Sequence, residues 1–310
     1  MQKLLITGDT GFVGRNLVEK LQCTNKSDGK PKQIVTLNGT RLNKSADFSH
    51  FLEGVEGVIH CAGQTPKKGV SESVFYETNT EGTLNLAKQS AEAGVKRFIF
   101  ISTIKVNGEN TEQGRPFFAD DAHNPHDAYA RSKSLAERGL QLLSQDTGME
   151  VVIIRPTLVY GAGVESNFSS LVGLVARRVP LPFGKIKTNK RSLVSVDNLV
   201  DIILHCLHND KAANQTFLVS DDRAVSTSEM VYLISQSLGQ GTVMMLSIPV
   251  WAFGIFGKLL RKEAITDRLI GSLEVDIQKN KALLGWEPIQ SVEEGFKAAV
   301  SAINITRTNR

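Results

Sequence analysis

The sequence predicts an α/β protein built on a doubly wound parallel sheet, with a smaller, mostly helical C-terminal part interleaved with it. Short, unbroken apolar runs alternate with helical patterns through the first half, and a glycine-rich turn joins the first run to the first helix. After about residue 160 the alternation loosens. Apolar strands separated by helices are typical of a parallel sheet covered on both faces, with right-handed crossovers.

In the first half, the apolar runs predict five buried strands: Lys3–Gly8, Gln33–Asn38, Gly57–Gly63, Arg97–Thr103 and Glu150–Pro156. Helical patterns or turns lie between them: Gly14–Gln22, Phe48–Gly54, Tyr76–Ala93 and Ala128–Asp146.

In the second half we expect a loop over 161–167, a helix over Phe168–Arg178, a strand and helix within Arg191–Leu207, and a short strand in Gln215–Asp221. The predicted domains are residues 1–160, with 192–222 returning to them, and residues 161–310.

Composition excludes several functional classes. The 310 residues carry 36 basic and 32 acidic side chains, a net charge of only +4, so we expect no nucleic-acid partner. Cys23, Cys61 and Cys206 are an odd number without a CxxC pair, which indicates a reducing compartment and no metal site. The N-terminus begins directly with a strand pattern, so a cytoplasmic protein without a signal peptide is expected.

Two segments leave alternatives open. Residues 244–260 are mostly apolar but shorter than a membrane span and are interrupted by Pro249, so they predict a packing helix or lid, or a peripheral membrane contact. The basic run from Gly184 to Arg191 fits either a phosphate-bearing ligand or a solvated loop.

The glycine-rich turn predicts a dinucleotide site. Gly8, Gly11 and Gly14 stand between the first strand and the first helix. In that position the first glycine permits a tight turn, the second lets a pyrophosphate approach the backbone, and the third permits close helix–strand packing. The spacing is G-x-x-G-x-x-G.

The end of the second strand bears on the choice of dinucleotide. An NAD site usually keeps an acidic residue there for the ribose, but this strand ends in Asn38, Gly39, Thr40 and Arg41. Arg41 could accept a 2′-phosphate, which favours NADP(H). Alternatively Asn38 serves the ribose and NAD(H) binds.

Tyr129 and Lys133 lie one helical turn apart at the start of a predicted helix, so they share a face. A neighbouring ammonium favours the phenolate, and we therefore expect Lys133 to lower the pKa of Tyr129 toward the range of a general base. Ser102 and Thr103 lie at the carboxyl end of the fourth strand, the edge where open α/β sheets bind ligands.

These residues together resemble the extended short-chain dehydrogenase/reductases, in the nucleotide-sugar epimerase/dehydratase branch. The likeness spans nearly the whole chain and includes "VIHCAG", "NTEGTLNL", "FISTIKVNG", "IIRPTLVYG", "RSLVSVDNLVD" and "LLGWEP". It implies Thr103 as the hydroxyl on the reacting sugar oxygen, Tyr129 as acid/base and Lys133 as its partner.

The resemblance also implies the remaining site residues. For the cofactor they are Gly8, Gly11, Phe12, Val13, Gly14, Asn38, Arg41, Asp47 and Phe48 near the adenine, Cys61, Ala62, Gly63, Asn79 bracing the adjacent loop, Ser102, Tyr129, Lys133 and Pro156. For a UDP-sugar they are Thr103, Asn167, Phe183, Arg191 and, on a looser match, Asp276.

The likeness limits the reactions that are expected of this chain. Dehydratases of this branch read Thr-Asp-Glu where this chain has Thr103, Ile104 and Lys105, so elimination is not expected. Chemistry at C4 remains. The absent ribose acid and Asn107, where epimerases usually have tyrosine, favour 4-keto reduction, as in bacterial surface-polysaccharide (O-antigen) enzymes that make UDP-N-acetylquinovosamine. The alternative is a UDP-glucose or UDP-N-acetylglucosamine 4-epimerase with tightly bound NAD.

A third hypothesis is a dinucleotide-binding sensor without catalysis, but such proteins typically lose the tyrosine or the lysine. Relatives often dimerise through the helices predicted here over Tyr76–Ala93 and Ala128–Asp146, so a homodimer is expected.

Overall fold

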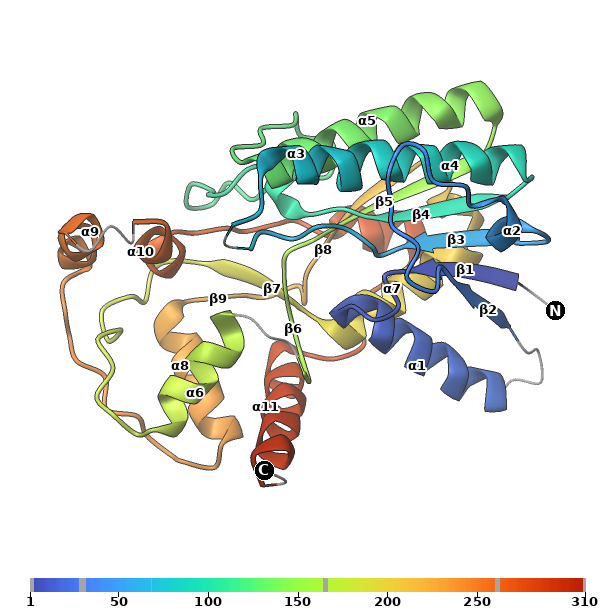
Figure 1. Cartoon of the computed structure of the whole chain (residues 1–310). Coiled ribbons are helices and arrows are strands. Elements are labelled where there is room, and N and C mark those ends of the chain that lie inside the picture. The colour runs from blue at the N-terminus through green and yellow to red at the C-terminus, as the bar shows by residue number, and fades with distance from the viewer. Residues whose placement is uncertain (1–2, 28–31, 68, 164–166, 260–262, 309–310) are drawn as a thin grey trace.

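The centre of the molecule is a six-stranded parallel sheet (Figure 1). The computed structural model describes residues 3–27, 32–67, 69–163, 167–259 and 263–308. The strands are β1 (Lys3–Thr7), β2 (Gln33–Thr36), β3 (Gly57–His60), β4 (Arg97–Ile101), β5 (Glu150–Pro156) and β8 (Thr216–Val219), in the order β2-β1-β3-β4-β5-β8. The predicted doubly wound α/β fold is confirmed, because the order reverses at β1.

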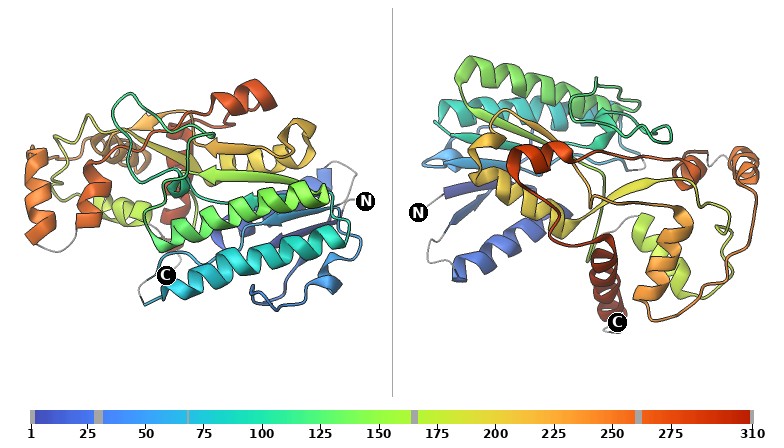
Figure 2. Two further views of the ribbon diagram at one scale, coloured as in Figure 1. Left: turned by 90° about the horizontal axis from the view of Figure 1, so that it is seen from above. Right: turned by 180° about the vertical axis from the view of Figure 1, so that it is seen from behind.

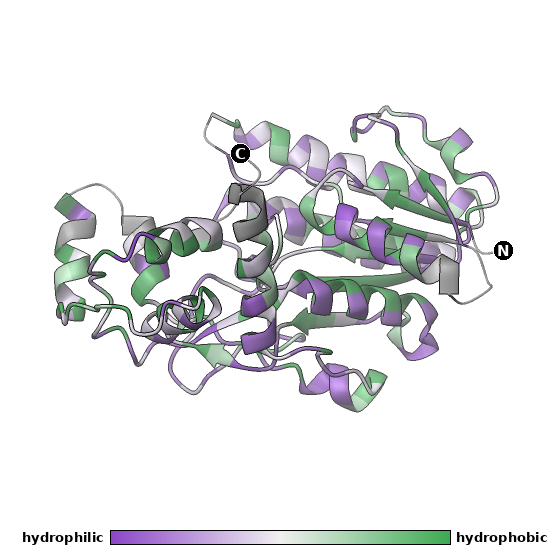
Figure 3. Ribbon diagram, turned by 90° about the horizontal axis from the view of Figure 1, so that it is seen from below, coloured by the Kyte–Doolittle hydropathy of each residue, from purple (hydrophilic) through white to green (hydrophobic). Residues whose placement is uncertain are grey.

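Helices cover both faces of this sheet (Figure 2). On one side lie α1 (Phe12–Ser27) and α7 (Val196–His208), which share a buried apolar core with β1, β3, β4 and β5. On the other lie α2 (Ser49–Leu52), α3 (Glu72–Phe75), α4 (Thr83–Glu92) and α5 (Ala128–Thr147). The hydropathy colouring follows this arrangement, with hydrophobic strands inside and helices of mixed character outside (Figure 3).

The helix predicted over Tyr76–Ala93 differs in one respect. Its first part, η1 (Tyr76–Gly82), is a π-helical segment between α3 and α4. A π-turn carries one more residue than an α-turn and therefore redirects the side chains it bears. Here it turns Asn79 into the interior, where the residue is fully buried.

The second half adds a smaller three-stranded sheet of β6 (Leu158–Tyr160), β7 (Arg191–Ser195) and β9 (Ala224–Val225), in the order β6-β7-β9. Around it stand α6 (Asn167–Ala176), α8 (Thr227–Ser237), α9 (Val250–Leu259), α10 (Glu263–Ile270) and α11 (Val292–Thr308), with the short η3 (Asp210–Ala212) and η4 (Asn280–Leu284). In the segment 192–222, α7 and β8 lie with the main sheet, whereas β7 pairs with β6 and β9 instead.

All six strands of the main sheet end at one edge, and the functional side chains follow those ends. After β4 the chain forms a short turn, η2 (Ile104–Val106), and a loop over 107–127 that leads into α5. The Asp127 carboxylate accepts the Ala130 N–H at 2.7 Å and so caps α5. That cap fixes the start of α5 and therefore the positions of Tyr129 and Lys133 on it. Within the described residues, every helix is too short or too polar to cross a bilayer.

Candidate active site

The glycine turn after β1 has the geometry that its sequence predicts. Gly8 has a positive φ of 70°, and a Cβ there would lie 2.7 Å from the Ala62 backbone nitrogen. A Cβ on Gly14 would lie 2.1 Å from the Gly8 carbonyl oxygen. These contacts leave room only for glycine, and they bring the N-terminus of α1 against the ends of β1 and β3.

The turn opens onto a cavity of about 810 Å³. Five of the predicted cofactor residues line it: Gly8, Asn38, Arg41, Ala62 and Gly63. Sequence analysis did not assign to the site the other lining residues in the loops that follow β1, β2 and β3, although the strand-end rule indicates these loops: Asp9, Thr10, Leu37, Gly39, Thr40, Leu42, Asn43 and Gln64. Val74, Glu77 and Thr78 come from the neighbouring helical segment and had no such signal. A helix N-terminus, a close-packed glycine turn and a cavity of this size fit a dinucleotide.

Arg41 stands at the mouth of this cavity and is exposed. Asn38 adopts a positive φ of 48°, a conformation that asparagine tolerates well, and its side-chain oxygen accepts the Thr36 hydroxyl at 3.0 Å. Both residues line the cavity in which the predicted ribose or 2′-phosphate would lie.

Asn79 braces the cavity from beneath. Its side-chain oxygen accepts the Gln64 N–H at 2.7 Å, and its amide nitrogen donates to the Gln64 carbonyl at 3.0 Å and to the Ser132 hydroxyl at 3.0 Å. The amide thus ties the loop after β3 to α5, which is the arrangement expected for this residue.

Lys133 lies at the centre of the site. The residue is 3% exposed, and its ammonium donates to the Ile101 carbonyl at 2.9 Å and lies 4.4 Å from the centre of the Phe100 ring. A Cβ on Gly63 would lie 3.2 Å from the ammonium nitrogen, so this lysine borders the dinucleotide cavity. Burial lowers the pKa of Lys133 to about 8, although nearby Cys61 and Glu137 oppose that shift.

The Tyr129 phenol lies beside Thr103 and forms a hydrogen bond with its side chain. The predicted lowering of its pKa by Lys133 is wrong for the protein's own groups, because burial raises the pKa of Tyr129 to about 12. The hydrogen bond from Thr103 opposes this shift, and the charge of Asp127 adds to it. Lys133 does not compensate, since its ammonium bonds the Ile101 carbonyl.

Lys105 occupies the position at which the dehydratases described above have a glutamate. The Lys105 ammonium pairs with Asp127 at 2.5 Å and with Glu109 at 2.8 Å. Burial alone would raise the pKa of Asp127, but the bonds from Lys105 and from the Ala130 N–H hold it below its usual range. The pair therefore keeps the α5 cap ionised beside Tyr129.

A buried ionic network lies directly beneath these groups. The Arg155 guanidinium, 2% exposed, binds both oxygens of the fully buried Glu137 carboxylate at 2.6 to 3.1 Å. It also donates to the Asn107 side-chain oxygen at 2.9 Å and bonds His123 Nε2 at 2.7 Å. The Ser102 hydroxyl donates to Glu137 as well.

This network changes the interpretation of two residues. Ser102 is buried and committed to Glu137, so its side chain belongs to the support of the site and not to the cofactor cavity. Asn107 is 2% exposed and is bonded to Arg155 and to the Phe118 carbonyl. Its amide therefore serves this network, and Asn107 is not among the residues that line the dinucleotide cavity.

Several predicted cofactor residues lie outside the cavity lining. The Phe48 ring is fully buried in the core under α4, so it cannot contact an adenine, and the Asp47 carboxylate instead accepts the Ser49 N–H at 2.9 Å. Pro156 is buried at the end of β5. Three others support the turn from behind: Phe12 and Val13 pack on the core at the start of α1, and Cys61 is partly buried beside the same core.

The predicted substrate residues are spread over the second half. Arg191 begins β7, donates to the Gly271 carbonyl at 3.3 Å, and has a pKa lowered by burial and by the charge of Arg268. Two guanidinium groups therefore share one region. Sequence analysis missed Arg268, because no local motif distinguishes this arginine from the other basic residues of the chain.

The other predicted substrate contacts are weaker. Phe183 is 6% exposed and stacks on Phe253 of α9 with ring centres 6.3 Å apart, so its ring serves the core. The Asp276 carboxylate accepts the Gln278 N–H at 2.7 Å. The side chain of Asn167 lies outside the described residues.

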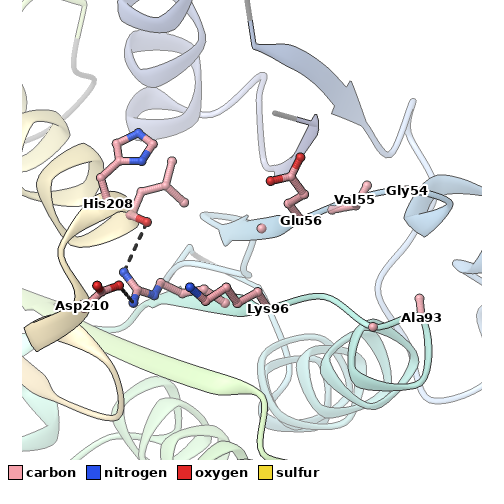
Figure 4. Close-up of a pocket in the computed structure, with 11 residues that line it drawn as sticks. Gly54, Val55, Glu56, Ala93, Lys96, His208 and Asp210 are labelled. Carbon is pink, nitrogen blue, oxygen red and sulfur yellow. Dashed lines mark hydrogen bonds and ion pairs between the residues drawn. The ribbon is translucent and has the colours of Figure 1, made fainter. Parts of the chain in front are cut away.

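A second hollow, of about 530 Å³, lies at the opposite edge of the sheet, where β3 and β4 begin (Figure 4). Arg97 dominates its wall, but that guanidinium pairs with Glu150 at 2.7 Å and donates to the carbonyls of Cys206, Leu207 and Asn209. Its donors close the end of α7, so we assign this hollow a structural role.

Comparison with known proteins agrees with this geometry. The model of the NAD dependent epimerase/dehydratase family matches residues 4–220. The chain is similar to the UDP-glucose 4-epimerase of Vibrio cholerae, with 48% identity over 318 aligned residues that cover 97% of this chain and 95% of that protein. It is also 27% identical to the N-acetyl-α-D-glucosaminyl-diphospho-ditrans,octacis-undecaprenol 4-epimerase of Escherichia coli O157:H7, covering 84% of this chain and 81% of the relative.

Among solved structures, the UDP-glucose 4-epimerase of Thermotoga maritima, determined with UDP-glucose, matches with a TM-score of 0.78. The match covers 99% of this chain and 100% of that one at 22% identity, which supports the fold. The chain belongs to the NAD-dependent epimerase/dehydratase family.

Proposed function

We propose that this member of the epimerase/dehydratase family is a UDP-sugar 4-epimerase that works with a retained nicotinamide dinucleotide. The observation that carries the proposal is the 48% identity to a UDP-glucose 4-epimerase along almost the entire chain. The contact between Thr103 and Tyr129, with Lys133 at the edge of the cavity, supports it. Inversion at C4 needs one group that accepts the proton of the 4-hydroxyl and another that accepts the hydride of C4. These residues supply the proton acceptor.

In this proposal Tyr129 removes the proton of the sugar 4-hydroxyl and later returns it. Thr103 hydrogen-bonds the same oxygen and holds it within reach of the phenol. Lys133 lies one turn further along α5 and borders the cavity beside Gly63, where it would bond a ribose hydroxyl of a bound dinucleotide. When bound, the nicotinamide supplies the place where the hydride is held and from which it returns.

Because the pKa of Tyr129 is raised, this mechanism requires a further group that favours the phenolate. A phenol with a pKa of about 12 is a poor base at neutral pH. A positive charge placed beside it favours the phenolate, and an oxidised nicotinamide is such a charge. We therefore propose that the base is activated only in the complex with oxidised dinucleotide, so that the sugar's proton is not removed before a hydride acceptor is present.

Arg191 and Arg268 are the proposed contacts for the diphosphate of the substrate. Their mutual repulsion favours an anion between or beside them. A diphosphate occurs both in a UDP-sugar and in the lipid-linked substrate named for the Escherichia coli relative. We propose the UDP-sugar because the higher identity is to the enzyme that bears that name.

The proposal ranks 4-epimerisation above 4-keto reduction, whereas the sequence alone favoured 4-keto reduction. The argument from Asn107 no longer holds, since that amide is buried in the Arg155 network. The argument from Arg41 remains, because Arg41 lines the cavity and could bind a 2′-phosphate. Whether NAD or NADP binds therefore stays a prediction, with Arg41→Ala as its test: the change weakens binding of NADP but leaves that of NAD unaltered.

The deciding experiment supplies purified protein with UDP-glucose or UDP-N-acetylglucosamine and no added cofactor. An epimerase produces the C4 epimer and carries NAD through purification. A reductase instead oxidises NADPH only when a UDP-4-keto-sugar is added, which would overturn the proposal. Inertness to both substrates while dinucleotide remains bound would favour the sensor hypothesis.

Tyr129→Phe is the matched variant, because it removes one hydroxyl and keeps the ring against Phe75. We expect turnover to fall by about 10²–10⁴-fold with dinucleotide binding retained. The homodimer through α4 and α5 remains a prediction that sedimentation can test.

A further inference from the structure

Helix α9 combines a buried apolar side with an exposed apolar side. Ala252 and Phe253 are buried, and Phe253 stacks on Phe183. Trp251, Ile255 and Leu259 are 71%, 58% and 76% exposed. They stand at positions i, i+4 and i+8 and therefore form a stripe along one face. A helix that is apolar all round is normally covered on every side.

The extended segment before α9 also exposes apolar side chains. Residues 244–246 run beside residues 181–184, with the Leu246 N–H bonded to the Leu181 carbonyl at 2.7 Å and the Gly184 N–H to the Leu246 carbonyl at 3.0 Å. In an extended segment alternate side chains face opposite sides. Met245 accordingly packs on the core, whereas Met244 and Leu246 are 65% and 41% exposed.

Positive charge borders the exposed surface. Lys258 is exposed next to Leu259, and Lys185 and Lys187 are exposed just after Gly184. The two segments 180–191 and 244–262 contain seven lysines and arginines and no acidic residue, in a chain that is otherwise nearly balanced. Two of the seven, Arg261 and Lys262, lie outside the described residues.

We propose that this surface, defined by Met244, Leu246, Trp251, Ile255 and Leu259 with Lys185, Lys187 and Lys258 at its border, docks on the surface of an anionic lipid membrane. An interfacial helix places apolar side chains among lipid chains while lysines contact acidic headgroups, and tryptophan favours that boundary. A second copy of the chain fits less well, because a twofold contact sets a patch against itself and would bring the basic border onto its own equivalent.

Helix α9 lies at the end of the molecule far from β2 and the N-terminus (Figures 1 and 2). Docking there leaves the dinucleotide cavity open to solution, since that cavity is built at the ends of β1, β2 and β3. The inference therefore does not depend on which sugar the enzyme converts.

The test is co-sedimentation of the full chain with vesicles of phosphatidylglycerol and phosphatidylcholine, and with vesicles of phosphatidylcholine alone. We expect binding to the anionic vesicles that weakens as salt is raised. The double variant Trp251→Glu/Ile255→Glu should lose about tenfold or more in binding, since each side chain no longer contributes its apolar burial. Ile289→Glu, which changes an exposed aliphatic residue outside the surface, should bind as the original protein does.

A triple change of Lys185, Lys187 and Lys258 to Gln should abolish the preference for anionic over neutral vesicles. Melting temperature and turnover in solution check that the variants remain folded. Absence of binding to anionic vesicles at low salt would overturn the proposal, as would undiminished binding by the Trp251→Glu/Ile255→Glu variant. Sedimentation that shows a dimer dissociated by that same variant would mean that a second copy covers the surface instead.

Discussion

Glu137→Gln tests whether the buried network beneath the catalytic residues is as strongly coupled as its geometry indicates. The substitution keeps the size of the side chain and removes its charge. Arg155 would then remain 2% exposed without its carboxylate, although its bonds to Asn107 and His123 would persist. Breaking one partner of a buried ion pair typically costs about 3–5 kcal/mol, so we expect the free energy of unfolding to fall by about that amount.

Urea unfolding followed by tryptophan fluorescence measures this loss, because Trp286 is 97% buried and its indole N–H is bonded to Asp201 at 2.7 Å. The control is Glu109→Gln, which removes a partly exposed partner of Lys105 and should cost less than about 1 kcal/mol. Glu137→Gln should also lose turnover. Glu137 accepts a hydrogen bond from Ser102, which precedes Thr103, and interacts with the charge of Lys133, which borders the cavity.

A double-mutant cycle completes the argument. Glu137→Leu and Arg155→Met each leave an unpaired buried charge, whereas the double variant leaves none. We expect the double variant to cost several kcal/mol less than the two single changes added together. A loss below about 1 kcal/mol for Glu137→Gln, or additive losses in the cycle, would show that the reasoning from burial and bidentate contact is wrong.

Three further predictions concern separate parts of the chain. Gly14→Ala should sharply weaken dinucleotide binding in a fluorescence titration, because its Cβ would lie 2.1 Å from the Gly8 oxygen, whereas Gly254→Ala in open space should not. Arg268→Gln should raise the KM for the UDP-sugar about tenfold or more without changing dinucleotide affinity. Burial holds the pKa of His60 at about 3, so the unfolded chain binds a proton that the folded chain does not between pH 6.5 and 3. Stability should therefore fall by about 1.4 kcal/mol per pH unit from this group as pH drops through that range, and His60→Gln should flatten the slope measured by urea unfolding.

The sequence was most informative where one local rule decides the structure. Unbroken apolar runs identified five of the six strands of the main sheet, and β8 was found as the short strand in Gln215–Asp221. The glycine turn was equally readable, because only glycine meets the contact distances at Gly8 and Gly14.

The sequence was least informative where a side chain's direction depends on tertiary packing. Phe48 and Ser102 stand near strand ends or turns, as binding residues do, but one fills the core and the other bonds Glu137. Arg268 is brought beside Arg191 from 77 positions away, which no local spacing reveals. The pKa of Tyr129 depends likewise on where the Lys133 ammonium points, and helical spacing does not fix that direction.

The π-segment η1 has a consequence for how this chain could change over time. One surplus residue within 76–82 is absorbed locally, while α3 and α4 on either side keep ordinary helical geometry. Deleting a single residue there would convert the π-turn to an ordinary α-turn and leave α3 and α4 in their orientation, but side chains within the segment would shift by about 100° around the helix axis. Asn79 would then lose its reach to Gln64 and Ser132. A one-codon deletion could thus uncouple the loop after β3 from α5 without altering any strand of the sheet.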